Sequence, residues 1–145
     1  MFIAERAAAL FDEVEVSVLI NPDKKGAFAI DERVDMAREA LKHLSNVTVN
    51  SFSGLLVDFL RQRKSSIVIR EYEFQMALMN RQLAPEIETL FIVTDAKYSF
   101  LSSHTIKDVF QLGGEVRNLV PPYVHRRLVE RFHSGVKAGA AVVKS

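Results

Sequence analysis

The sequence has no cysteine, no excess of charge of either sign and no apolar run of membrane-spanning length. Without cysteine the protein forms no disulfide, uses no thiolate nucleophile and holds no cysteine-bound zinc. Its 19 basic and 18 acidic residues nearly cancel, so no overall field draws it to nucleic acid or to anionic lipid. Residues 1–6 lack the basic start and the cleavage pattern of a signal peptide. We therefore expect a cytoplasmic protein with neither a nucleic-acid nor a membrane partner.

The composition that remains is ordinary for a globular protein, with 48% apolar and 26% charged residues. A chain of 145 residues can build one domain with a real core, but not two comfortable ones. We expect this domain to span 1–133. The small residues of 134–145 predict a flexible tail.

Apolar residues at helical spacing alternate along the chain with short β-branched runs. We expect helices at 2–11, 30–44, 55–63, 71–83 and 105–112 and a last one that ends at Phe132, and strands at 14–20, 47–49, 66–69 and 89–94. This alternation predicts an α/β fold in which helices cover both faces of a Rossmann-like parallel sheet. Ligands of such sheets bind in the loops that follow the strands, here 21–28, 51–56, 70–73 and 95–104.

The segment 98–104, Tyr-Ser-Phe-Leu-Ser-Ser-His, lies between an expected strand and an expected helix. Hydroxyl side chains at a helix start favour an anion, because the first backbone N–H groups and the helix dipole both point there. Taken alone, the segment is better explained by Ser102 or Ser103 acting only as a helix N-cap. His104 stands out among the histidines because it directly follows these serines.

Two basic residues follow expected strands and could bind a phosphate. Lys24 lies in the loop after the first strand, where a solvated lysine is the common alternative. Arg70 ends an apolar strand, where a guanidinium needs an anion or a carboxylate. A substrate clamp and an ion pair with Glu71 or Glu73 are equally good explanations of Arg70. Glu73 lies in a first helical turn, which favours a carboxylate whatever its role.

Apolar side chains form two stripes on the expected helix 71–83, one with Met76, Met79 and Leu83 and one with Phe74 and Leu78. A helix of this kind lies in the core or at a subunit interface. Phe52, Leu55 and Leu56 offer an apolar wall for the aliphatic part of a ligand, although core packing is the more common explanation.

The four histidines, His43, His104, His125 and His133, lack the spacing of a metal site. No metal-binding residue is therefore predicted, and we expect His125 and His133 to lie on the surface of the last helix.

Several segments, taken in order, resemble bacterial phosphopantetheine adenylyltransferases of the nucleotidyltransferase α/β family. The most specific are Tyr-Glu-Phe-Gln-Met-Ala-Leu-Met-Asn-Arg at 72–81 and Tyr-Ser-Phe-Leu-Ser-Ser at 98–103. The supporting segments are 5–14, 21–25, 31–34, 51–59, 85–89 and 119–122. The resemblance runs from Phe2 to the last helix.

The resemblance implies reversible transfer of the adenylyl group of ATP to 4′-phosphopantetheine, which gives dephospho-coenzyme A and pyrophosphate in coenzyme A biosynthesis. It implies magnesium as the cofactor and a homohexamer as the assembly. It assigns Lys24, Leu56 and Arg70 to the pantetheine substrate. The residues that it assigns to ATP are Glu73, Tyr98, Ser99, Phe100, Leu101, Ser102, Ser103 and His104.

The sequence departs from the family pattern at three places. The family begins with a central strand and a Gly-(Ser/Thr)-Phe-Asp-Pro…Gly-His motif, whose histidine stabilises the transition state, and neither is present here. Arg70 runs directly into Glu71, where the family has a loop whose arginine neutralises ATP phosphates. His104 replaces the last serine of the phosphate segment.

These departures leave no catalytic residue to assign, and we expect the chain as written to have little or no adenylyltransferase activity. Without the central strand, two neighbouring strands lose their hydrogen-bond partner. Two alternatives stay open: a non-catalytic relative that binds nucleotide or coenzyme A and oligomerises, and a degenerate product that does not fold stably.

Overall fold

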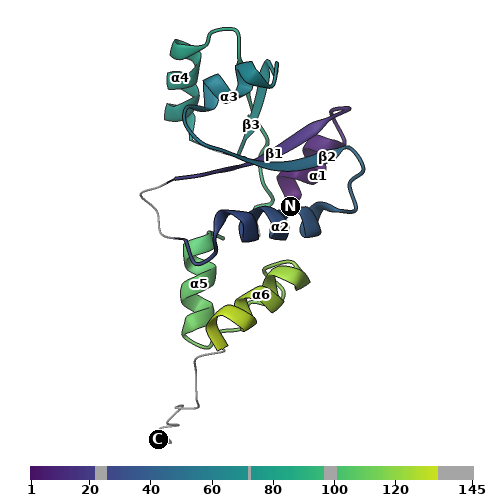
Figure 1. The fold of residues 1–145 in the computed structure, drawn as a ribbon, viewed down its shortest axis with the longest axis vertical. Helices are drawn as coiled ribbons and strands as arrows, with labels where there is room; N and C mark the ends of the chain where they lie inside the picture. Colours follow the sequence, from purple (N-terminus) through teal and green to yellow (C-terminus); the bar gives the residue numbers. More distant parts are fainter. Residues whose placement is uncertain (22–25, 72, 97–100, 134–145) are drawn as a thin grey trace, which may run out of the picture. The chain divides into compact units, whose positions relative to one another are not determined.

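The computed structural model describes residues 1–21, 26–71, 73–96 and 101–133 (Figure 1). By its internal contacts the chain divides into two units, Met1–Ser99 and Phe100–Ser145, and each is described here by itself. The prediction of one domain over 1–133 stays a prediction, and the predicted tail lies outside the described residues.

Six helices and four strands are described, and they alternate along the first unit. The helices are α1 (Phe2–Ala8), α2 (Ile30–Leu41), α3 (Leu56–Gln62), α4 (Phe74–Leu83), α5 (Ser103–Gln111) and α6 (Pro122–His133). The strands are β1 (Val14–Leu19), β2 (Val47–Phe52), β3 (Ile67–Arg70) and β4 (Glu88–Phe91).

The valine-rich strands β1 and β2 pair in parallel, from Val14 opposite Val47 to Leu19 opposite Phe52 (Figure 1). Helix α2 packs against this sheet through Val34 and Leu41, which form a buried cluster with Val49. β2 is twice as long as predicted, since its polar end at Asn50 and Ser51 stays paired with β1. Alternation of burial along a strand, rather than a continuous apolar run, explains why the sequence pattern missed this half.

Strands β3 and β4 form a second parallel pair, with Arg70 opposite Phe91 at its last position. Behind this pair lies a buried cluster of four residues contributed by α3 and by the segment that joins α4 to β4. Its members are Val57, Leu60, Ala84 and Ile87. The cluster holds α3 and the end of α4 against the second sheet, and thereby fixes the connection that follows Arg70.

The α/β class and the parallel pairing are confirmed, but the described strands form two two-stranded sheets rather than one sheet. Within the described residues, both outer edges of each pair are therefore left without a neighbouring strand.

The second unit contains α5 and α6, whose buried residues include Ile106, Phe110 and Leu128. The helix α5 ends at Gln111, and Gly113, just beyond the C-cap, has a φ of +83°, the left-handed conformation that commonly follows a helix. The prediction of His125 as a surface residue is wrong. Its side chain is only 16% exposed and packs edge-on against the Phe110 ring, with 6.1 Å between the ring centres.

Candidate active site

Arg70 and Glu73, two of the residues predicted to bind substrates, lie together where β3 leads into α4. The Arg70 guanidinium donates a hydrogen bond to the Glu73 carboxylate and forms an ion pair with it. The Arg70 side chain is 24% exposed and that of Glu73 is 50% exposed. The sequence left two explanations open for Arg70, a substrate clamp and an ion pair with Glu71 or Glu73. The structure contains the ion pair with Glu73.

The connection from β3 to α4 is short, since only residues 71–73 separate the two elements. Glu73 adopts the left-handed conformation, with φ +82° and ψ 55°, which a residue with a Cβ adopts at a cost of about 1–2 kcal/mol. It occupies the N-cap of α4, yet within the described residues its side chain accepts no hydrogen bond from the helix. The Glu73 carboxylate accepts a hydrogen bond from Arg70 instead.

Leu56, the predicted pantetheine contact, is the first residue of α3 and packs against the cluster of Val57, Leu60, Ala84 and Ile87. The neighbouring Leu55 is 60% exposed. This arrangement agrees with the core-packing explanation for Leu56, while the exposed Leu55 offers apolar surface beside it.

The Phe52 ring stacks on Phe59, with 4.5 Å between the ring centres. The Arg63 guanidinium lies 5.3 Å from the centre of the Phe59 ring on the same helix. Phe52 is thus held at the end of β2 by its packing on α3, which agrees with the ordinary packing role that the sequence favoured.

The described part of the predicted phosphate segment, Leu101 to His104, belongs to the second unit. The Ser102 hydroxyl accepts a hydrogen bond from the Thr105 backbone N–H at 3.0 Å, so Ser102 is the N-cap of α5. His104 is exposed, and its Nε2 lies 3.2 Å from the Asp108 carboxylate. The capping role of Ser102 is thereby observed, and its contact with ATP phosphates stays a prediction.

Four predicted site residues, Lys24, Tyr98, Ser99 and Phe100, lie outside the described residues. Among those that are described, Arg70 and Glu73 are brought together. Leu56 lies in the same unit, where it packs against the buried cluster of α3.

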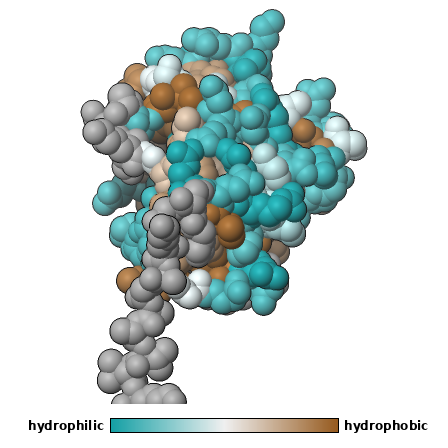
Figure 2. Space-filling view, turned by 60° about the horizontal axis from the view of Figure 1, so that its bottom comes forward, coloured by the Kyte–Doolittle hydropathy of each residue, from teal (hydrophilic) through white to brown (hydrophobic). Residues whose placement is uncertain are grey.

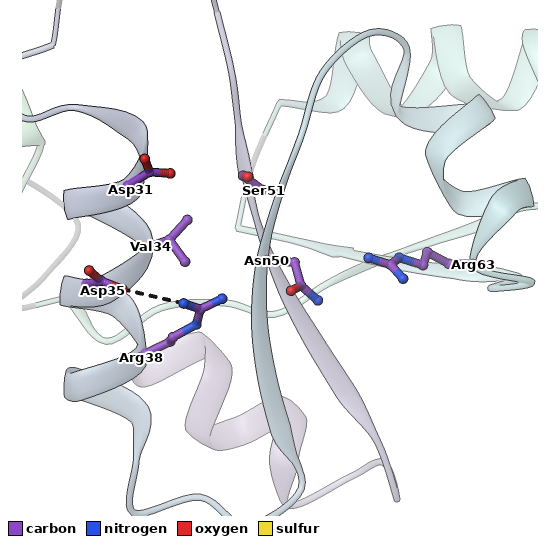
Figure 3. Close-up of a pocket in the computed structure, with 7 residues that line it drawn as sticks. All are labelled: Asp31, Val34, Asp35, Arg38, Asn50, Ser51 and Arg63. Carbon is purple, nitrogen blue, oxygen red and sulfur yellow. Dashed lines mark hydrogen bonds and ion pairs between the residues drawn. The ribbon is translucent and has the colours of Figure 1, made fainter.

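A polar pocket of about 330 Å³ lies between α2, the end of β2 and the end of α3 (Figure 3). It is lined by Asp31, Val34, Asp35, Arg38, Asn50, Ser51 and Arg63. The Arg38 guanidinium is engaged by Asp35 at 3.4 Å and by the Val49 carbonyl at 3.1 Å, and Arg63 lies 3.3 Å from the Glu15 carboxylate. Its cations are therefore already neutralised, and no predicted site residue lines it. No local sequence pattern predicts this pocket, because its lining is spread over three elements.

The Arg61 guanidinium links α3 to the segment before β4. Its Nε donates to the Glu86 carboxylate at 2.8 Å, and its terminal nitrogen donates to the Leu83 carbonyl at 3.2 Å. The pKa of Glu86 is lowered, first by a hydrogen bond from its own backbone and then by Arg61. The hydrogen bond to Glu86 is likewise the main cause that raises the pKa of Arg61.

No group of three or more metal-ligating side chains occurs within the part of the chain that the structure describes. Magnesium commonly binds through one or two carboxylates together with substrate phosphates. None of the described helices has the length and apolarity needed to cross a membrane.

Comparison with known proteins identifies the family. The cytidylyltransferase-like family model matches residues 1–109. The chain belongs to the cytidylyltransferase-like family. Among its relatives is the phosphopantetheine adenylyltransferase of Heliobacterium modesticaldum, 49% identical over 150 residues that cover 98% of this chain and 89% of that protein. The enzyme of the same name from Clostridium perfringens is 49% identical, with 91% and 85% covered. The resemblance seen in the sequence of this cytidylyltransferase-like protein is thereby confirmed.

The match to the Heliobacterium protein extends over 150 positions, more than the 145 residues of this chain. The relative therefore has residues inside the matched region that this chain lacks. The position of the departure predicted between Arg70 and Glu71 stays a prediction, and in this chain three residues, 71–73, separate β3 from α4.

Proposed function

We propose that this cytidylyltransferase-like protein transfers the adenylyl group of ATP to 4′-phosphopantetheine, which releases pyrophosphate and gives dephospho-coenzyme A. The observation that carries the proposal is the identity of about half of all residues to named phosphopantetheine adenylyltransferases across nearly the whole chain. The phosphate oxygen of phosphopantetheine forms a bond to the α-phosphorus of ATP, and the bond from that phosphorus to the pyrophosphate breaks.

This reaction needs no protein nucleophile, because positioning and charge neutralisation can supply the catalysis. We assign Arg70 and Lys24 to the phosphate of phosphopantetheine and Leu56 to its aliphatic arm. We assign Glu73 and residues 98–104 to ATP, with magnesium on the nucleotide phosphates. The position of Arg70 at the carboxyl end of a parallel strand supports its role, since ligands of α/β sheets bind at these ends.

A homo-oligomer in the cytoplasm, the hexamer that the resemblance implies, is part of the same proposal. Five large apolar side chains of α4 are 47% to 67% exposed: Phe74, Met76, Leu78, Met79 and Leu83. Figure 2 shows hydrophobic residues reaching the surface between hydrophilic ones on one face of the molecule. Of the two explanations left open for this helix, the exposure of these five residues supports a subunit contact rather than core packing within the chain.

A second candidate is a relative that binds these ligands without turning them over. The observation that favours it is the short connection after Arg70, which leaves no room for the loop arginine that the resemblance assigns to ATP. Both candidates retain binding of phosphopantetheine, and they differ only in product formation.

A thermal-shift titration tests the binding that both candidates share. ATP and 4′-phosphopantetheine should each raise the unfolding midpoint, because a ligand at 100 times its Kd stabilises the folded state by about 2.7 kcal/mol. In an Arg70→Gln variant the shift caused by phosphopantetheine should shrink while the shift caused by ATP persists. If neither ligand shifts the wild-type protein, the proposed substrates are wrong.

A further inference from the structure

The connection between β3 and α4 places a carboxylate on the guanidinium that the proposed function assigns to a substrate phosphate. Arg70 is the last residue of β3, and Glu73 precedes the first residue of α4. Their ion pair engages one terminal nitrogen of the guanidinium, Nη2. A phosphate binds a guanidinium most strongly through two parallel N–H donors, so Glu73 and a phosphate compete wherever such a bond needs Nη2.

The backbone favours this pairing over the usual role of an N-cap residue. Glu73 has a φ of +82° and, within the described residues, no side-chain hydrogen bond to the helix that it precedes. Its carboxylate is half exposed and reaches back across three residues to Arg70. The two charged groups are separated by only three positions in the sequence, and their side chains are in contact.

We infer that Glu73 is an intramolecular competitor for Arg70 and weakens the binding of the substrate phosphate in this chain. The inference rests on the proposed function only for the identity of the ligand, a phosphate monoester. Removal of the Glu73 charge should therefore strengthen phosphate binding rather than weaken it. A Glu73 that serves only as a contact for ATP would have no such effect on phosphopantetheine.

Isothermal titration of the full chain with 4′-phosphopantetheine, pantetheine and inorganic phosphate tests the inference. Glu73→Gln should tighten phosphopantetheine about threefold to fivefold, the range that loss of an exposed ion pair allows, and leave pantetheine unchanged. Glu71→Gln is the matched control. It removes the same charge two residues away, from an exposed side chain for which the described residues show no bond to Arg70.

The double variant Arg70→Gln/Glu73→Gln separates competition from a general change in charge. Glu73→Gln should have no effect on phosphopantetheine binding in the Arg70→Gln background, because Glu73 affects the phosphate only through Arg70. Equal or weaker phosphopantetheine binding by Glu73→Gln, or an equal gain in Glu71→Gln, would overturn the inference. So would a Glu73→Gln protein that binds none of the phosphate probes.

The same titrations distinguish failure of the inferred competition from failure of the proposed function. If Glu73→Gln binds inorganic phosphate more tightly through Arg70 but ignores phosphopantetheine, the competitor is confirmed and the proposed substrate is wrong. If wild type and Glu73→Gln bind phosphopantetheine equally well, the substrate stands and the competitor is refuted. Circular dichroism of each variant establishes that the proteins compared are folded.

Discussion

At the scale of single residues, the least expected feature is a pair of non-glycine residues in the left-handed conformation, Lys64 and Glu73. Lys64 follows the C-cap of α3 at φ 55°, a position that glycine fills in many helices. Glu73 precedes α4 and holds Arg70. The backbone strain at Lys64 is of the kind found at many helix ends. At Glu73 the strain occurs where two predicted substrate residues meet, and strain of this kind is typical of positions where function constrains the backbone.

Replacement of Lys64 by glycine should stabilise the protein. A glycine lacks the Cβ that disfavours positive φ, but it also increases the conformational entropy of the unfolded chain. The net increase in the free energy of unfolding should be about 0.5–1 kcal/mol. Urea unfolding followed by circular dichroism measures the change. Lys64→Ala is the control, since it removes the same charge and keeps the Cβ. Equal stability of the glycine and alanine variants would show that Lys64 is not strained.

The sequence predicted some of these residues and missed others for identifiable reasons. Ser102 was predicted as a possible N-cap, because capping depends on a hydroxyl at a helix start and little else. The packing of His125 against Phe110 was not predicted, since it depends on a contact between two helices that no local pattern encodes. The roles of Lys24, Leu56 and the ATP segment stay predictions.

At the scale of elements, the helix and strand types follow from local periodicity, while their ends depend on tertiary contacts. β2 extends to Phe52 because β1 continues to pair with it. α4 begins at Phe74, later than predicted, because Glu73 leaves the helical conformation. The residues of the two predicted apolar stripes on α4 are exposed, and Ala77 and Asn80 are buried instead, because periodicity alone cannot distinguish an interface from a core.

The contact between α3 and the segment before β4 should depend on pH. The folded-state pKa of Glu86 is lowered, so its contribution is fully present above its unfolded pKa of about 4.3 and is lost as the pH falls through the lower folded value. Arg61 keeps its charge throughout this range. Glu86→Gln should therefore lower the unfolding midpoint slightly at pH 7, and the difference from wild type should shrink below about pH 4.

The measurement is a pair of thermal unfolding series for wild type and Glu86→Gln from pH 7 to pH 3. Glu88→Gln, in the same segment but paired with Arg81, is a control for the general effect of removing a surface carboxylate. A difference between wild type and Glu86→Gln that grows in acid would contradict the assignment.

At the scale of the whole molecule, the described strands form two pairs, and α4 presents apolar side chains that are exposed among the described residues. The α/β class was predictable, because alternating helices and strands with short connections allow few other arrangements. The division of the strands into two sheets was not predictable, because it depends on pairing between segments far apart in the sequence.

If α4 is a subunit contact, a charge placed in its apolar stripe should weaken assembly. We expect wild type to sediment as an oligomer and Met79→Lys to shift the equilibrium toward smaller species, because a buried lysine without a partner is costly. Gln82→Lys adds the same charge at an exposed polar position of the same helix and should leave assembly unchanged. Analytical ultracentrifugation measures the masses. A wild-type monomer, or equal effects of both variants, would exclude this surface as the contact.

The most direct test of the central claim is the formation of dephospho-coenzyme A from ATP and 4′-phosphopantetheine with magnesium, followed by mass spectrometry. We predict product that requires both substrates, formed far more slowly than by the Heliobacterium enzyme assayed in parallel, and lost in Arg70→Gln. The slow rate is expected because the short connection after Arg70 lacks the loop arginine. Absence of dephospho-coenzyme A under conditions in which both substrates bind would contradict the proposed reaction and favour the non-catalytic relative.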